Sequence, residues 1–329
     1  MNRADGGKAK YVAPEKAPVE AVLARASSAP LKPRDDSSDS SDSELEALAT
    51  QAKQKKPKKS KVIRPLARLG AYCSSHHFPG NTHPEPFTRH PTSLIANHVY
   101  SFSEKMFAKY HEAYAAAIFE HNKKYLMRVY PFGLRFSSSN ADPTEFWKRG
   151  AQLVALNWQK CDEGMMLNEG MFAGEGGYVL KPPGFRPGDA PPVFHKLDLT
   201  IDVIAASNMP LPEDDDTARG FEPYVKIEVH TTNENARPSD VKRKTKAKRG
   251  IDCVWDTTLE FKAVDGIIEK LTFVRFKVHD SELGRDDLAA WACVRLDRLQ
   301  QGFRLVRLFD NEGRPSKGVI LVKVSKSVY

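Results

Sequence analysis

The sequence contains no long apolar run and few cysteines. No stretch of about 18 consecutive apolar residues occurs in it, so we expect no membrane-spanning helix. The N-terminal segment MNRADGGKAK lacks the apolar core of a secretory signal, so we expect no secretion. The cysteines, Cys73, Cys161, Cys253 and Cys293, lie far apart without CxxC spacing or neighbouring histidine pairs. This pattern predicts reduced cytosolic thiols.

Residues 1–62 have almost no aromatic residues. They contain the acidic block DDSSDSSDSELE, followed by the basic block KQKKPKKSK. Such a segment cannot bury enough apolar area to offset the entropy lost on ordering, and we expect it to be disordered. A solvated linker is the simplest interpretation, although the serines could accept phosphate and the lysines could touch anionic lipid.

The remaining sequence has ordinary globular composition and a formal net charge of +8. Its length allows about two domains. The positive charge favours a polyanionic partner, either nucleic acid or an anionic membrane surface, but charge alone does not choose between them.

Residues 63–185 alternate between apolar strand patterns and helical patterns. Residues 103–125 predict a helix with Phe107, Tyr110, Tyr114 and Ala117 on one face. A short helix should begin at Asp142 as N-cap, with Pro143 in its first position. Near-continuous apolar strands separated by helices predict a parallel α/β unit. The predicted strands are residues 93–100, 125–130, 152–159 and 176–182.

The pattern changes after the proline- and glycine-rich stretch KPPGFRPGDAPP. We interpret residues 186–194 as a linker. Residues 195–329 contain short alternating segments separated by turns, which predict an antiparallel β-sandwich. The predicted strands are residues 195–206, 222–230, 244–250, 254–263, 270–280, 291–297, 302–309 and 318–325.

Several motifs carry a resemblance to a known family. SFSE, HNKKYLMRVYPFGLR, SSSNADPTEFWKRGAQLVALNWQ and GGYVLKP together resemble the Y half of the catalytic barrel of eukaryotic phosphoinositide-specific phospholipases C. VWDTTLEF, LTFVRFKVHD and QGFRLVRLFDNEG resemble the C2 domain that follows it. The resemblance implies a multi-domain chain, with half of a (β/α)8 TIM-like barrel at 63–185, a C2 β-sandwich at 195–329, and a linker-like segment at 1–62.

The resemblance also implies an activity. The family hydrolyses phosphatidylinositol 4,5-bisphosphate to diacylglycerol and inositol 1,4,5-trisphosphate, with calcium polarising the phosphate and a base activating the inositol 2-hydroxyl. The family's X half, which carries the proton-transfer histidines, has no counterpart here, so we expect no catalytic residue in this chain. Catalysis would need an X half supplied by another polypeptide. The alternative is a non-catalytic, calcium-responsive membrane-binding module.

By resemblance, three residues bind substrate. Arg128 contacts a phosphate on the inositol ring, Tyr130 packs against the ring, and Ser101 donates a hydrogen bond to a ring phosphate. Each has a structural alternative: Ser101 could cap a helix with Glu104, Arg128 could pair with Glu104, and Tyr130 could belong to the core. Leu134 stands where the family places an apolar residue that dips into the bilayer.

The C2 resemblance implies calcium as cofactor. The matching acids are Glu222, Asp252, Asp280, Glu282 and Asp287. Two of them are glutamates where aspartate is usual, and solvated loop acids are the alternative.

A basic stretch alternates along a predicted strand, with Lys242, Arg243, Lys244, Lys246, Lys248 and Arg249. It favours an anionic membrane over nucleic acid, because no stacking aromatic set accompanies it. The alternative is a solvated strand at the edge of the sheet, whose charge keeps it from aggregating. We therefore expect a cytoplasmic protein, peripheral at the inner face of the plasma membrane. Expressed alone, residues 63–185 should aggregate, because an open sheet leaves two edges unpaired, whereas residues 195–329 should fold independently.

Overall fold

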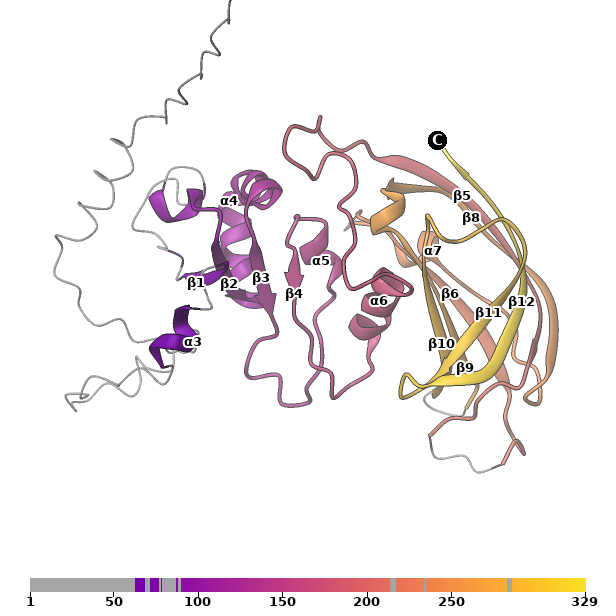
Figure 1. The fold of residues 1–329 in the computed structure, drawn as a ribbon. Helices are drawn as coiled ribbons and strands as arrows, with labels where there is room; N and C mark the ends of the chain where they lie inside the picture. Colours follow the sequence, from indigo (N-terminus) through magenta and orange to yellow (C-terminus); the bar gives the residue numbers. More distant parts are fainter. Residues whose placement is uncertain are drawn as a thin grey trace, which may run out of the picture. The chain divides into compact units, whose positions relative to one another are not determined.

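The computed structural model describes residues 63–68, 72–76, 78, 87, 90–213, 217–233, 235–282 and 286–329 (Figure 1). The chain divides into two compact units, Met1–Arg68 and Leu69–Tyr329. The described part of the first unit contains the short helix α3 (Arg64–Arg68). The segment predicted to be disordered, 1–62, lies outside the described residues. No helix in the described part of the chain is long and apolar enough to cross a membrane.

The first part of the second unit is built on a parallel sheet, as predicted. In the described residues its strands are β1 (Ser74–His76), β2 (His98–Ser103), β3 (Met127–Tyr130) and β4 (Leu153–Val154), in the order β1-β2-β3-β4. All three pairings are parallel. Such a sheet needs crossover connections, and helix α4 (Glu104–Lys124) provides the one from β2 to β3.

Two of the predicted strands do not lie at the residues where they were predicted. The first predicted strand, 93–100, begins only at His98, because residues Pro91–Leu94 form the 3-10 helix η4. Residues 176–182 form no strand, and β1 supplies the fourth strand instead. Gly177 has a φ of +87°, a left-handed conformation that interrupts an extended strand. The predicted strand 152–159 is reduced to the two residues of β4.

Helix α4 covers one face of the parallel sheet. Phe107 and Ile118 on α4 share a buried core cluster with Tyr100 and Phe102 on β2 and Val129 on β3. Because side chains alternate along a strand, the residues between these core positions lie on the opposite face of the sheet. That second face carries Ser101, Arg128 and Tyr130.

Two further helices complete this part. Helix α5 (Thr144–Trp147) has Pro143 at its N-cap, one residue later than predicted. Asp142 Oδ1, just before it, accepts a hydrogen bond from Thr144 N at 2.8 Å. Helix α6 (Glu163–Phe172) was not predicted. Its first turn is capped by Asp162, which accepts from Met165 N at 3.2 Å.

The rest of the unit is antiparallel, as predicted. The described strands form one sheet in the order β7-β6-β9-β10-β11-β12-β5-β8. β10 and β11 pair only through Ala290 with Asp310 and Trp291 with Phe309. The sheet folds over at this short junction, and its two parts enclose a shared core. The strands are β5 (His195–Ser207), β6 (Pro223–His230), β7 (Lys242–Lys244), β8 (Cys253–Ile267), β9 (Phe273–Asp280), β10 (Leu288–Arg295), β11 (Gly302–Asp310) and β12 (Pro315–Val328).

The predicted basic strand 244–250 was wrong in place, since β7 ends at Lys244. The following residues still run beside β6, because Thr245 N donates to Val225 O and Lys248 N donates to Pro223 O, each at 3.0 Å. Their spacing departs from a regular ladder, so the strand ends there. Short helices α7 (Pro238–Val241) and η5 (Glu269–Leu271) connect strands in this part.

Candidate functional site

Three polar side chains gather on the sheet face opposite α4. Ser101 of β2 and Arg128 of β3 are register partners, and Arg128 Nη1 donates a hydrogen bond to Ser101 Oγ at 3.1 Å. Tyr130 lies two residues further along β3 on the same face, with its ring centroid 4.9 Å from the guanidinium carbon of Arg128. The structure therefore brings together the three residues that were predicted to bind substrate.

The structure also decides between these roles and their alternatives. The N-cap of α4 is Ser103, whose Oγ accepts from Met106 N at 3.4 Å, so Ser101 does not cap this helix. Glu104 pairs with Arg135 instead of Arg128. Among the described residues no carboxylate pairs with Arg128, which is exposed, so its charge is available to an anion.

Glu104 and Arg135 form a two-pronged ion pair. Arg135 Nε donates to Glu104 Oε1 at 2.5 Å, and Arg135 Nη2 donates to Oε2 at 2.7 Å. Glu104 Oε1 also accepts from Phe132 N at 2.9 Å. Burial raises the pKa of the Glu104 carboxyl, but the bonds from Arg135 and Phe132 outweigh it and hold this pKa below its usual range. The pair fastens the loop after β3 to the end of β2.

A second set of hydrogen bonds joins the loops after β3 and β4. Asn157 N donates to Asn140 Oδ1 at 2.6 Å, and Asn140 Nδ2 donates to Asn157 O at 3.1 Å. These fixed loops expose apolar side chains: Leu134 is 45% exposed, Phe136 91% and Trp158 79%. Leu134 is thus accessible to a membrane, as its predicted role requires. Phe136 and Trp158 were not predicted as surface groups, since nothing in their local sequence pattern signals exposure.

The predicted calcium residues lie on neighbouring loops at one end of the antiparallel sheet. Gly250 N donates to Phe221 O at 2.9 Å, and Ser281 N donates to Glu222 O at 3.1 Å. These bonds place the loops around 222, 252 and 280 beside one another. Asp287 joins them, because its carbonyl accepts from Asp280 N at 2.9 Å. Glu282 is an exposed residue of the same loop.

Several of these carboxylates are occupied by protein donors. Glu222 pairs with Arg249 at 2.7 Å, and Asp280 Oδ1 accepts from Glu222 N at 2.8 Å. Hydrogen bonds from Ser207 Oγ and Asn208 N lower the pKa of Asp252. The described residues contain no group of three or more His, Cys, Asp or Glu side chains placed to hold a metal ion. Several of the five acids are thus engaged by protein donors, and the calcium set stays a prediction.

The predicted membrane-binding cations are mostly at the surface. Lys242, Lys244, Lys246, Lys248 and Arg249 are exposed, and Arg243 is half-buried. Lys244 Nζ lies 4.5 Å from the ring centroid of Tyr224, and the guanidinium carbon of Arg243 lies 5.3 Å from that of Phe261. Lys242 lies 3.6 Å from the buried Glu228, so part of its charge is already balanced.

Comparisons with known proteins match both parts of the chain. Residues 66–184 match the family described as phosphatidylinositol-specific phospholipase C, Y domain, and residues 197–310 match the C2 domain. The chain contains a phospholipase C Y domain followed by a C2 domain. The expected family is thereby confirmed.

Individual relatives agree with the family match. The human 1-phosphatidylinositol 4,5-bisphosphate phosphodiesterase delta-3 is 31% identical over 81% of this chain, which covers 34% of the human protein. The rat inactive phospholipase C-like protein 1 is 32% identical over 63% of the chain and 20% of the rat protein. The crystal structure of L. pealei PLC21 superposes with a TM-score of 0.66 at 25% identity, over 83% of this chain and 35% of that one.

The Y domain and the C2 domain together span about a third or less of the length of these relatives. Both an enzyme and a protein named inactive are among them. Similarity alone therefore does not assign catalysis to the Y domain. The structural feature that bears on its function is the exposed Arg128 together with Ser101.

Proposed function

We propose that this chain supplies the substrate-positioning part of a phosphoinositide phospholipase C, which hydrolyses phosphatidylinositol 4,5-bisphosphate to diacylglycerol and inositol 1,4,5-trisphosphate. The Arg128 guanidinium binds a phosphate on the inositol ring, Ser101 donates to a ring phosphate, and Tyr130 packs against the ring. Catalysis requires an X half that carries the proton-transfer groups.

One observation carries this proposal. Arg128, exposed and without a carboxylate partner among the described residues, is bonded to Ser101 and lies over Tyr130 on the sheet face opposite α4. Two phosphate-binding groups beside an aromatic ring suit a phosphorylated cyclic polyol. Their position near the carboxyl ends of parallel strands is the usual place for ligands in barrels of this kind.

We further propose that the four parallel strands are half of a (β/α)8 barrel. α4 covers one face, and the other face presents Ser101, Arg128 and the 42%-exposed Leu153, the register partner of Arg128 on β4. An X half would extend the sheet from its edges and enclose this second face.

Binding of soluble inositol 1,4,5-trisphosphate to the full chain, measured by calorimetry, tests the site. Arg128→Ala should weaken binding about tenfold or more, and Arg128→Lys should restore only part of it because a point charge replaces a planar set of donors. Arg304→Ala, which removes an exposed arginine from β11, is the matched control. Equal binding by the wild type and Arg128→Ala would exclude Arg128 as a headgroup ligand.

Catalysis is tested separately. The full chain, with and without a separately expressed X half from the human relative, is assayed for release of inositol phosphate from vesicles. We expect release only from the combination, and its loss in Arg128→Ala. No release from either preparation would remove the enzyme proposal.

The second candidate function is a non-catalytic membrane-binding protein that works through its C2 domain. The similarity to a relative named inactive favours it. Under either function we propose a peripheral protein at the cytoplasmic face of the plasma membrane, with calcium as cofactor. Sedimentation with phosphatidylserine vesicles, with calcium or with a chelator, tests the cofactor. Equal sedimentation in both would exclude a calcium requirement.

A further inference from the structure

Helix α6 belongs to the Y domain by sequence but packs on the C2 domain. The Y-domain match ends at residue 184, well after Phe172, the last residue of α6. Yet Met166 and Leu167 of α6 share a buried apolar cluster with Phe273 of β9 and Trp291 of β10. This cluster, which also contains Trp147 of α5 and Phe185, attaches the helix to the C2 sheet.

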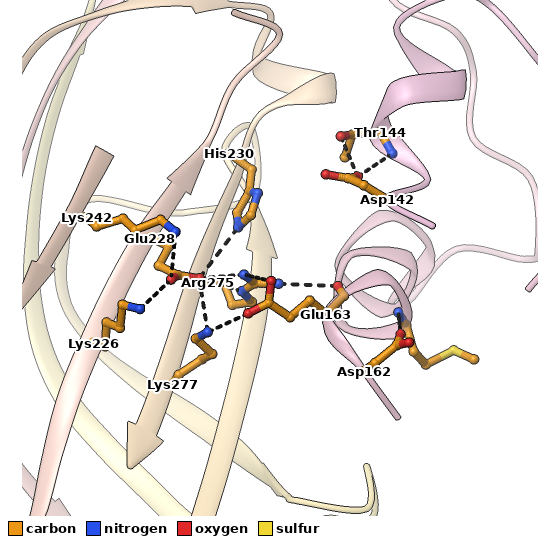
Figure 2. A network of polar contacts seen from close by, with 11 residues as sticks. Asp142, Thr144, Asp162, Glu163, Lys226, Glu228, His230, Lys242, Arg275 and Lys277 are labelled. Atoms are coloured by element: carbon orange, nitrogen blue, oxygen red, sulfur yellow. Dashed lines mark hydrogen bonds and ion pairs between the residues drawn. The ribbon is translucent and has the colours of Figure 1, made fainter. Parts of the chain in front are cut away.

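The N-terminal end of α6 is held by charge (Figure 2). Glu163 Oε1 lies 2.7 Å from Lys277 Nζ, and Glu163 Oε2 lies 3.1 Å from Arg275 Nη2. Arg275 Nη1 also donates to the Glu163 carbonyl at 3.3 Å. Burial raises the pKa of Glu163, but the charges of Arg275 and Lys277 outweigh it and lower this pKa to about 2.

Without Glu163, the part of the C2 sheet that faces the start of α6 would carry a surplus of positive charge. The carboxylate at its centre, Glu228, is 1% exposed and is surrounded by cations: Arg275 at 2.5 Å, Lys226 at 3.0 Å, Lys277 at 3.4 Å and Lys242 at 3.6 Å. Arg275 and Lys277 are themselves only 1% and 8% exposed. Because buried charges need partners, Glu163 supplies the second carboxylate that this group of cations requires.

The C-terminal end of α6 is held by two more arginines of the C2 domain. Arg295 Nη1 donates to the Met171 carbonyl at 3.2 Å, and Arg298 Nη1 donates to the Ala173 carbonyl. Arg298 also pairs with Glu175 at 2.5 Å. Carbonyls in the last turn have no partner within a helix, and the helix dipole favours cations there.

The middle of α6 approaches the sheet closely. A Cβ atom on Gly170 would lie 2.7 Å from Cys293 Sγ, a distance at which one of the two groups would have to move. The helix therefore meets the sheet through its backbone at this point.

We propose that the β9–β10 face of the C2 domain is a receptor for helix α6. It recognises an acidic first turn through Arg275 and Lys277, a glycine that faces Cys293, and C-terminal carbonyls through Arg295 and Arg298. The Y and C2 domains consequently form one cooperative unit, and the C2 domain does not act as an autonomous module. Residues 195–329 alone would expose Phe273 and Trp291 and leave Arg275 with one carboxylate partner.

The full chain tests this with a protease recognition sequence inserted between Ala190 and Pro191, both of which are exposed. After complete cleavage, size-exclusion chromatography with light scattering reports whether the two fragments stay together. We expect one complex of intact mass at micromolar concentration. Separation of the wild-type fragments would overturn the proposal.

Two variants of the cleaved chain identify the contacts. Glu163→Lys places a cation against Arg275 and Lys277 and should weaken association about tenfold or more, whereas Glu120→Lys on the exposed side of α4 should leave it unchanged. If Glu163→Lys does not fold, Arg298→Met serves instead, because its side chain is 33% exposed and tolerates replacement. Wild-type association in the variant measured would show that these charges do not recognise α6.

Discussion

Gly170 of α6 and Cys293 of β10 are in such close contact that no side chain fits between them: a Cβ atom on Gly170 would lie 2.7 Å from Cys293 Sγ. Glycine normally costs a helix about 1 kcal/mol relative to alanine, so its presence inside α6 needs a reason. The close approach of the helix to the C2 sheet supplies it.

Gly170→Ala should therefore destabilise the protein in spite of its better helix propensity. We expect a loss of about 1–3 kcal/mol in the free energy of unfolding, measured with urea, because an added methyl overpacks the contact. Cys293→Ala in the same chain should recover part of the loss. Gly176→Ala is the control, since no atom lies within 4 Å of its Cβ position. Equal stability of Gly170→Ala and the wild type would contradict the close contact.

Glu104→Ala should loosen the loop after β3. Arg135 and Phe132 N would each lose a hydrogen-bond acceptor, and we expect a cost of about 1–3 kcal/mol, measured by urea unfolding. Proteolysis within residues 131–139 should also become faster. Glu120→Ala, which removes an exposed pair with Lys123, should cost less than about 0.5 kcal/mol. Similar losses in the two variants would show that Glu104 has no special role.

The contribution of Glu163 should depend on pH with a definite sign. Its pKa falls from 4.5 to about 2 in the folded protein, so its stabilising effect is complete above pH 4.5 and is lost as the pH falls toward about 2. Urea unfolding of the wild type and Glu163→Gln at about pH 7, 5 and 3.5 checks this. The advantage of the wild type should be constant between the first two and smaller at the third. An advantage that grows on acidification would have the wrong sign.

Charge reversal at Lys246 and Lys248 should weaken binding to anionic vesicles. Both side chains are exposed, and each basic residue near such a surface contributes about 1 kcal/mol. Sedimentation with phosphatidylserine vesicles should show the loss at low salt and a smaller difference at high salt. The double variant Arg304→Glu and Lys317→Glu changes the charge equally at other exposed positions and is the control. An equal loss in both double variants would indicate nonspecific attraction.

Much of the geometry of the candidate substrate site could be predicted from residue spacing and family resemblance. Arg128 and Tyr130 are two residues apart on an apolar strand, and the strand period places them on one face. Ser101 lies 27 positions earlier, and only the register of β2 against β3 brings it to 3.1 Å from Arg128. The choice of Arg135 as the partner of Glu104 likewise depends on how the loop after β3 turns back.

By itself, the sequence determined the parallel unit and the antiparallel unit, because strand and helix periods are local properties of consecutive residues. The resemblance of its motifs indicated the family. Only the tertiary structure decided that α6 is bound at both ends and along its middle by the C2 sheet. The contacts of Glu163 with Arg275 and Lys277 join residues more than a hundred positions apart. These two buried cations already share Glu228, and they need a second carboxylate. Pairing of this kind follows from packing and burial, which no local pattern contains.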